Sequence, residues 1–423
     1  RLHNGRMTYT YGAALDSVGV IQLHDGFGGP LAYDARDADL FHEMYAYETI
    51  SGDVRFKHNE FWDVTLAGAA TTESDPSAFG NRVAFERSSY NGDIILTTAS
   101  EPLVDRSSGT TRYETAVAAS KGYFRSGADI VVLCTGENFP DALSAAPWAR
   151  FLKAPVLLAR RTSVPESVMD EIERLGATDI WIVGGESAVS SAVKTQLEAA
   201  GLNVDRQLQG ADRYATSAKI ANFLYDAVVG DGRPFSGQAF VARGDSFPDA
   251  LAVAPLAAAT YSPIILVRTN APLPAASDDV FEFLPIRSAF IVGGTDVVSE
   301  EVELAIEVWT TLHNGSSSPA TRMEGDDRYE TAVSVLRNAV SMNWLDLDTV
   351  GIATGANFPD ALGGGAALGT YGSPLLLTRP GSLPPSVSAV LTQRAAEIGR
   401  VDIFGGEDVV SDAVRAEITG LLP

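Results

Sequence analysis

Short apolar runs alternate with amphipathic segments in the second quarter of the chain. The runs at 129–136, 155–160 and 179–185 are rich in branched apolar side chains, which is typical of strands covered on both faces. The segments between them, 141–153 and 164–176, have the spacing of helices that bury one face. Strands that alternate with helices predict crossover connections, so this stretch is expected to form a three-layer α/β domain with a parallel sheet.

The same alternation occurs three times, with landmarks in a fixed order. Each copy has an Arg-Tyr pair, then Phe-Pro-Asp-Ala, then an apolar run that ends in Gly-Gly; the tetrapeptides begin at residues 139, 247 and 358. This order indicates a triplication. Because the chain ends after the last helix of the third copy, we expect the strand before each Arg-Tyr pair to open its own repeat. Residues 102–108 are then predicted to lie in the first sheet, and the predicted domains are 101–208, 209–323 and 324–423.

Residues 1–100 contain none of these landmarks and form a separate predicted module. Segments 5–12, 18–25, 81–88 and 93–100 read as short strands, and Asn91-Gly92 carries a hairpin signal. The module is expected to be mostly β. Its role is not indicated by the sequence, although self-assembly through it is one hypothesis.

The longest uncharged run, residues 250–267, is about as long as a membrane span. It contains Pro255 and Pro263, and the matching part of the first copy carries Arg150 and Lys153. We interpret it as a buried helix followed by a buried strand, and predict no membrane insertion.

Charge and cysteine content narrow the possible partners. The chain has 54 acidic and 31 basic residues, a net charge of −23, which disfavours nucleic acid and anionic membranes as partners. An anionic ligand must therefore be met by a local site. The single cysteine, Cys134, excludes an internal disulfide framework and is predicted to be a small buried apolar residue.

The sequence gives no support for cofactor, metal or catalytic chemistry. It has neither a G-x-G-x-x-G motif after a strand nor a Walker lysine, so nucleotide cofactors are not expected. No G-x-S-x-G motif occurs, and the histidines match no metal-binding spacing, so neither catalysis nor a metal site is predicted. These histidines are His3, His24, His42, His58 and His313.

The recurring polar residues allow two interpretations each. Aspartates 141, 249 and 360 follow a proline and precede apolar helical runs, as N-capping residues do. Arginines 112, 213 and 328 either form an ion pair with the aspartate of their own copy or bind an anionic ligand through the planar guanidinium. Each Gly-Gly pair is either a tight turn or a backbone site for an anion.

With its Arg-Tyr, Phe-Pro-Asp-Ala and Gly-Gly landmarks in this order, the chain resembles the cell wall binding repeat 2 family over residues 101–423. The resemblance implies a pseudo-threefold arrangement of the three domains. An apolar triplet follows the tetrapeptide helix in that family, and here triplets begin at 156, 264 and 375. Two features depart from the family pattern. Thr111 stands where an acid is usual. Six residues before the Arg-Tyr arginine, copies one and three have Arg106 and Arg322, whereas copy two has Gln207, with Arg206 one residue earlier.

The resemblance implies a secreted, non-catalytic cell-surface protein that binds an anionic wall polysaccharide or secondary wall polymer without a covalent bond. A start at Arg1 is expected if a secretion signal has been removed. The alternatives are a subunit of a surface layer (S-layer) or filament, and an amidase-like wall hydrolase that the repeats anchor. Candidate polymer-binding residues are Arg112, Arg213, Arg328, Arg106, Arg322, Gly184, Gly185, Gly293, Gly294, Gly405 and Gly406, and candidate structural residues are Tyr113, Tyr214, Tyr329, Asp141, Asp249 and Asp360.

Overall fold

The computed structural model describes strand residues 7–10, 20–24, 30–34, 53–56, 83–85 and 94–98, and residues 103–422 except 139, 247 and 318. The chain divides into two compact units. One unit comprises residues 1–103 with 396–400 and 422–423, and the other comprises residues 104–395 with 401–421.

The described strands of the first hundred residues form two antiparallel sheets with orders β1-β2-β3 and β4-β6-β5. All four predicted strands are confirmed, and two further strands, β3 and β4, were not predicted. The turn at Asn91-Gly92 and residues His3, His42 and His58 lie outside the described residues. The strands are β1 (Met7–Thr10), β2 (Val20–His24), β3 (Pro30–Asp34), β4 (Asp53–Phe56), β5 (Val83–Phe85) and β6 (Ile94–Thr98).

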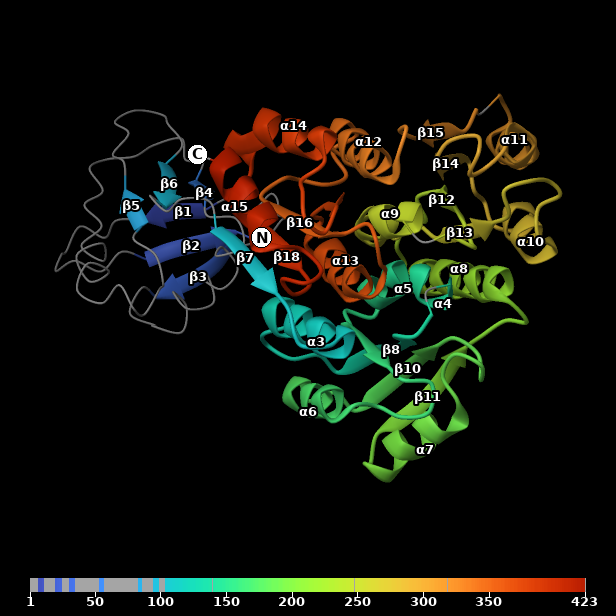
Figure 1. Cartoon of the computed structure of the whole chain (residues 1–423), viewed down its shortest axis with the longest axis horizontal. Coiled ribbons are helices and arrows are strands. Elements are labelled where there is room, and N and C mark those ends of the chain that lie inside the picture. The colour runs from blue at the N-terminus through green and yellow to red at the C-terminus, as the bar shows by residue number, and fades with distance from the viewer. Residues whose placement is uncertain are drawn as a thin grey trace. The chain divides into compact units, whose positions relative to one another are not determined.

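The first repeat forms a four-stranded sheet of order β11-β10-β8-β9 with parallel pairing, which confirms the predicted α/β class. Its helices connect successive strands on the two faces of the sheet (Figure 1). The elements are α3 (Arg112–Tyr123), β8 (Ile130–Thr135), α4 (Pro140–Leu143), α5 (Ala145–Phe151), β9 (Val156–Ala159), α6 (Glu166–Leu175), β10 (Asp179–Val183), α7 (Ser191–Ala199) and β11 (Asn203–Leu208).

The second and third repeats form equivalent sheets, of orders β13-β12-β14-β15 and β17-β16-β18-β7. The second repeat consists of α8 (Arg213–Gly230), β12 (Gln238–Arg243), α9 (Pro248–Ala259), β13 (Ile264–Val267), α10 (Ala275–Phe283), β14 (Ser288–Val292), α11 (Glu300–Asn314) and β15 (Thr321–Met323). The third consists of α12 (Arg328–Ser341), β16 (Thr349–Thr354), α13 (Pro359–Tyr371), β17 (Leu375–Thr378), α14 (Pro385–Arg394), the 3-10 turn Ala395–Glu397, β18 (Arg400–Phe404) and α15 (Asp412–Leu421), and its sheet is completed by β7 (Leu103–Ser107).

The predicted place of the strand before each Arg-Tyr pair is wrong. Strand β7 belongs to the sheet of the third repeat, where the Gly405 amide donates to the Ser107 carbonyl over 3.0 Å. Strands β11 and β15 likewise close the sheets of the first and second repeats. Strand β7, which precedes the first repeat, thus takes the place beside β18 that β11 and β15 take beside β10 and β14. The three sheets are thereby closed into a cycle.

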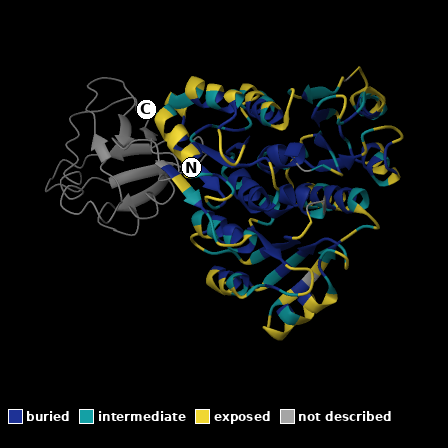
Figure 2. Ribbon diagram, in the orientation of Figure 1, coloured by how far each residue is buried: buried dark blue, intermediate teal, exposed yellow. Residues whose placement is uncertain are grey.

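Small residues allow the centre of this cycle to be densely packed. Helices α5, α9 and α13 pack against one another, and Figure 2 shows α9 and α13 as buried over most of their length. A Cβ on Gly364 would lie 2.5 Å from the ring of Phe404, so the helix can approach β18 only with glycine there. The predicted buried helix and strand within residues 250–267 are confirmed as α9 and β13.

Each central helix also packs against the Arg-Tyr helix of the next repeat. The pairs are α5 with α8, α9 with α12, and α13 with α3, so the last pair joins the third repeat to the first. This cyclic contact pattern is the pseudo-threefold arrangement that the resemblance implied. Among the described helices, none combines the length and the apolar character that crossing a membrane requires.

Candidate functional site at the repeat junctions

We call a junction the place where the Phe-Pro-Asp-Ala segment and Gly-Gly turn of one repeat meet the Arg-Tyr helix of the next. The 1/2 junction contains Asp141 and Arg213, the 2/3 junction contains Asp249 and Arg328, and the 3/1 junction contains Asp360 and Arg112. All three lie at the carboxyl ends of parallel strands, where open α/β sheets bind their ligands.

The Arg-Tyr helices begin at each junction with a side-chain cap. Asp212 accepts from the amide of Ala215 over 2.9 Å, and Asp327 accepts from the amide of Tyr329 over 2.9 Å. Thr111 accepts from the amide of Glu114 over 3.4 Å, and the Glu114 carboxylate accepts from the Thr111 amide in return. The departure from the family at Thr111 therefore keeps the capping function, because threonine and aspartate both supply a cap oxygen.

The Phe-Pro-Asp-Ala aspartates are not helix caps. Helix α13 is capped at Phe358 and starts at Pro359, so Asp360 is its second residue, and the capping prediction is wrong there. Instead, each aspartate lies against the first glycine of the Gly-Gly pair in its own repeat. A Cβ on Gly184, Gly293 or Gly405 would lie 3.1, 3.0 or 3.0 Å from the Oδ2 atom of Asp141, Asp249 or Asp360, respectively.

The Gly-Gly pairs are turns with a backbone that requires glycine. Their first residues have φ of +117° at Gly184, +104° at Gly293 and +116° at Gly405, in the left-handed region that side chains avoid. The following helices start only later, at Ser191, Glu300 and Asp412. The turn interpretation is confirmed, and the Gly-Gly amides do not form the N-terminus of a helix.

The arginine opposite each aspartate comes from the next repeat. Asp141 accepts a hydrogen bond from Thr216 and lies near Arg213, and Asp360 accepts one from Thr115 and lies near Arg112. The pairing predicted inside each repeat is therefore wrong in its assignment, because α5, α9 and α13 pack against the following repeat's Arg-Tyr helix. The third pair of charges is Asp249 with Arg328.

Burial makes these carboxylates costly to ionise. It raises the pKa of Asp249 to about 6, although Arg328 and Arg243 act in the opposite direction. Burial likewise raises the pKa of Asp141 and of Asp360, against the hydrogen bonds and the arginine charge that favour the ionised form. Each junction thus contains a carboxylate whose charge is only partly compensated.

Inside its own repeat, each Arg-Tyr pair packs against the glycine that follows the first strand. The Nη1 atoms of Arg112, Arg213 and Arg328 donate to the carbonyls of Gly136, Gly244 and Gly355 over 2.5, 2.8 and 2.5 Å. A Cβ on any of these glycines would lie 2.8 Å from the Cε1 atom of the tyrosine, Tyr113, Tyr214 or Tyr329. The arginine therefore binds the end of a strand in its own repeat and acts electrostatically on the carboxylate of the preceding repeat.

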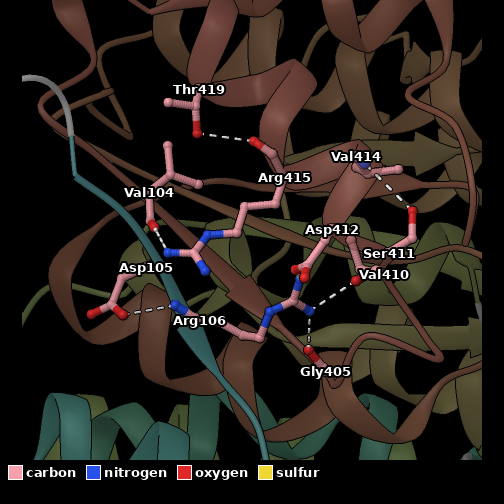
Figure 3. A network of polar contacts seen from close by, with 10 residues as sticks. All are labelled: Val104, Asp105, Arg106, Gly405, Val410, Ser411, Asp412, Val414, Arg415 and Thr419. Carbon is pink, nitrogen blue, oxygen red and sulfur yellow. Dashed lines mark hydrogen bonds and ion pairs between the residues drawn. The ribbon is translucent and has the colours of Figure 1, made fainter.

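The other predicted arginines hold the Gly-Gly turns. Arg106 donates to the carbonyls of Gly405 and Val410 over 2.7 and 2.8 Å and lies 3.3 Å from Asp412, as Figure 3 shows. Arg322 donates to the carbonyl of Gly293 over 2.8 Å. In the first sheet the Gln207 amide does the same, over 2.8 Å to Gly184 and 3.2 Å to Val189.

Three arginines that the sequence reasoning missed complete the junctions. Arg160, Arg268 and Arg379 are exposed, and their Cζ atoms lie 5.5, 5.2 and 5.0 Å from the ring centroids of Tyr113, Tyr214 and Tyr329, respectively. Each follows the apolar triplet of its repeat by two residues. Alignment of the triplets could have revealed them, because the neighbouring loop residues differ while the arginine recurs.

Acidic groups also flank the junctions. Asp327 lies 3.7 Å from Arg379, so at least one junction is of mixed charge.

Cys134 is buried, as predicted, and burial raises the pKa of its thiol. The ring Nε2 of His313 lies 2.8 Å from the Phe281 carbonyl, and within the described part of the chain no group of three acidic, histidine or cysteine side chains is arranged to hold a metal.

A family model described as cell wall binding domain 2 matches residues 106–194, 207–303 and 322–415. The matches cover more than half of the chain and coincide with the three α/β repeats. The chain belongs to this family.

Relatives and solved structures agree with this assignment. The N-acetylmuramoyl-L-alanine amidase LytC of Bacillus subtilis (strain 168) is 28% identical over 325 residues, which are 77% of this chain and 60% of LytC. The amidase enhancer of the same strain is 27% identical over 315 residues, 74% of this chain and 40% of the enhancer. The chain thus spans less than two thirds of both relatives. The structure of Cwp6 from Clostridium difficile shares the fold, with a TM-score of 0.68 and 22% identity over 98% of this chain and 58% of Cwp6.

Proposed function

We propose that this chain attaches a cell-surface protein non-covalently to an anionic wall polymer, without catalysing a reaction, through its three junctions. The observation that carries the proposal is the recurrence of an exposed arginine over a tyrosine ring at all three junctions, Arg160, Arg268 and Arg379. Such an exposed stack contributes only about 0.5–1 kcal/mol to stability. Its outward N–H groups can bind a phosphate or carboxylate in a fixed geometry.

The net charge of −23 requires that binding be local. A polymer that approaches the protein meets long-range repulsion, which only short-range contacts at the junctions can overcome. Acidic neighbours such as Asp327 keep the affinity of each junction low. Three junctions on one polymer chain then add their effects by avidity.

The residues predicted from the sequence have different parts in this proposal. Arg112, Arg213 and Arg328 directly precede the tyrosines on which the exposed arginines stack. In this proposal they contact polymer groups that enter the junction. Arg106 and Arg322 use their donors on internal carbonyls, so they act by holding the Gly-Gly turns in place. The turns limit how deeply a ligand can enter.

The test compares retention of the full chain on purified cell walls before and after chemical removal of their anionic polymers. We expect retention to require these polymers, and the triple variant Arg160→Gln, Arg268→Gln, Arg379→Gln to lose it. The control triple Arg125→Gln, Lys194→Gln, Arg337→Gln removes the same charge from exposed positions outside the junctions. Retention on stripped peptidoglycan, or equal loss in both variants, would contradict the proposal.

Two alternatives are tested in the same experiments: a wall hydrolase, which the name of the relative LytC suggests, and a subunit of a surface layer. A wall hydrolase would release new amino groups from walls during incubation, and a surface-layer subunit would form ordered arrays on cells. Our proposal expects neither activity from this chain. Measured release of amino groups above that from a buffer control would favour the hydrolase.

A further inference from the structure

The first sheet differs from the second at its edge strand. The register of β10 and β11 shifts by one residue between the pairs Asp179↔Asn203 and Trp181↔Arg206, whereas the three pairs of β14 and β15 follow without a shift. After this shift the register matches that of the second sheet: Gln207 stands opposite Ile182 and holds the Gly-Gly turn, as Arg322 does opposite Ile291. Because strand side chains alternate between faces, Arg206 stands opposite Trp181 on the other face.

On that face, Arg206 lies over a pair of aromatic rings. Its Cζ atom is 5.5 Å from the ring centroid of Trp181 and 5.5 Å from that of Phe223, which belongs to α8 of the next repeat. The two rings are half-buried, and the arginine is exposed. Trp148 lies beneath, 4.9 Å from Trp181 between centroids and only 3% exposed. The guanidinium carbon therefore lies near both rings, while the arginine side chain remains exposed to solvent.

The donors of this guanidinium are not used inside the described part of the protein. The hydrogen bonds and ion pairs of the described side chains include none from Arg206, in contrast to Arg106 and Arg322. The indole N–H of Trp148 in the same cluster is also buried without an acceptor among the described atoms. Buried donors without acceptors are rare, so the cluster has polar groups that the fold itself does not satisfy.

In the other two sheets, the residue equivalent to Trp181 is buried. In the second sheet Phe290 stands there opposite Thr321 and is 5% exposed, packed 5.0 Å from the ring of Trp344. In the third sheet Asp402 is buried and accepts from the Ser107 hydroxyl over 3.1 Å. Packing of the fold therefore does not require an exposed cation over aromatic rings. This feature is particular to the first sheet.

We propose that Arg206, over Trp181 and Phe223, forms a binding site for a saccharide that carries one carboxylate or phosphate, separate from the junctions' three arginine stacks. The guanidinium binds the anion through two parallel N–H donors, and the sugar's C–H face packs on the exposed part of the rings. Asp179, two residues from Trp181 on β10, is held by Asn203 over 2.7 Å on the same face. Its charge disfavours densely charged ligands and favours a single anionic group.

The site can be tested with glucuronate and glycerol 3-phosphate as probes and glucose as the neutral comparison. The full chain is used with the junction arginines already replaced by glutamine, so that the outcome does not depend on the proposed junction function. Binding is followed by tryptophan fluorescence. We expect saturable signals with both acidic probes and none with glucose.

Two substitutions at Arg206 give the decisive comparison. Arg206→Gln is expected to weaken binding by about tenfold or more, and Arg206→Lys to weaken it less, because lysine keeps the charge but loses the planar fork. Arg337→Gln, which makes the same charge change on α12, is the matched control and should bind normally. Equal binding by Arg206→Gln and this control, or binding of glucose, would overturn the proposal.

A second variant covers the case in which Arg206→Gln fails to fold. Phe223→Leu keeps the arginine and most of the apolar volume but removes one of its two rings. We expect it to weaken binding of both acidic probes while leaving the far-UV circular dichroism unchanged. Unchanged binding of the acidic probes by both Phe223→Leu and Arg206→Lys would show that Arg206 and the aromatic rings do not form the binding site.

Discussion

Asp249 shows at the residue scale how the junctions combine burial with charge. Its side chain is 8% exposed, and its pKa of about 6 lies above the value of about 3.9 expected in the unfolded chain. The folded protein therefore holds this proton more tightly than the unfolded chain does. The stability linked to it is fully present below about pH 4 and is lost as the pH rises through about 6.

Asp249→Asn is accordingly expected to stabilise the protein at neutral pH. The gain in unfolding free energy should rise from near zero at about pH 4 to at most about 3 kcal/mol at about pH 7.5, since one pKa unit corresponds to about 1.4 kcal/mol. Urea unfolding at both pH values measures it. Asp226→Asn, on the exposed side of α8, is the control. A gain that does not depend on pH would show that ionisation of Asp249 is not its cause.

Gly184 tests the turn that faces the first junction. Its φ of +117° and the 3.1 Å separation between a Cβ and Asp141 Oδ2 predict that Gly184→Ala destabilises the protein, by about 1–3 kcal/mol. Thermal or urea unfolding measures the loss. Gly230→Ala is the matched control, because a Cβ there meets no atom within 4 Å and alanine favours the helix. Equal stability of the two variants would contradict the need for glycine in the turn.

At the scale of elements, β7 closes the cycle by pairing with β18 of the third sheet. The Arg106 guanidinium fastens β7 to the carbonyls of Gly405 and Val410, and Arg415 of α15 donates to the Val104 carbonyl over 3.0 Å (Figure 3). The contacts join segments from opposite ends of the triplicated sequence. Their loss is expected to loosen the third sheet first.

Arg106→Ala should therefore destabilise the protein by about 1–3 kcal/mol, since two carbonyls lose their donor at a site where the arginine is 11% exposed. Arg106→Gln should recover much of this loss, because Gln207 performs the same task in the first sheet. Hydrogen exchange of the β18 amides, together with urea unfolding, measures both effects. If glutamine is no better than alanine, the two positions are not functionally equivalent.

At the scale of the whole molecule, the presence of three equivalent junctions predicts how wall-polymer retention depends on the number of intact junctions. Replacing one of Arg160, Arg268 and Arg379 by glutamine should reduce retention on wall polymer modestly, and each further replacement should reduce it more steeply, as expected for avidity. Retention of the single, double and triple variants measures this series. A single replacement that removes all retention would point to one dominant site.

Salt should have a shallow effect on retention. Added salt screens the repulsion of a protein with a charge of −23 while it also weakens the arginine contacts, so the two effects oppose each other. Retention measured from about 0.05 to 0.5 M salt spans strong to weak screening. A loss of several orders of magnitude, as for a basic protein on a polyanion, would contradict binding by a few local arginines.

Within the repeats, the sequence by itself determined the triplication, the α/β class and the positions of the strands. It did so because local periodicity and recurring residues carry this information directly; the apolar run of β8 and the buried stretch of α9 and β13 are examples. The recurrence of Asp141, Asp249 and Asp360 likewise singled out the residues that the structure places at the junctions, although not their partners. For the Gly-Gly pairs the sequence left a turn and an anion site as alternatives.

Only the tertiary structure decided which repeat completes each sheet and which arginine faces each aspartate. A recurring residue has the same local sequence in every copy, so its pattern cannot distinguish a partner in its own repeat from one in the next. The packing of α13 against α3 makes that choice, and it places Arg112 opposite Asp360 and β7 beside β18. The tertiary structure also decided that Arg206 stands opposite Trp181 and beside Phe223 of the next repeat, because strand register and helix packing depend on neighbouring elements and not on the residues alone.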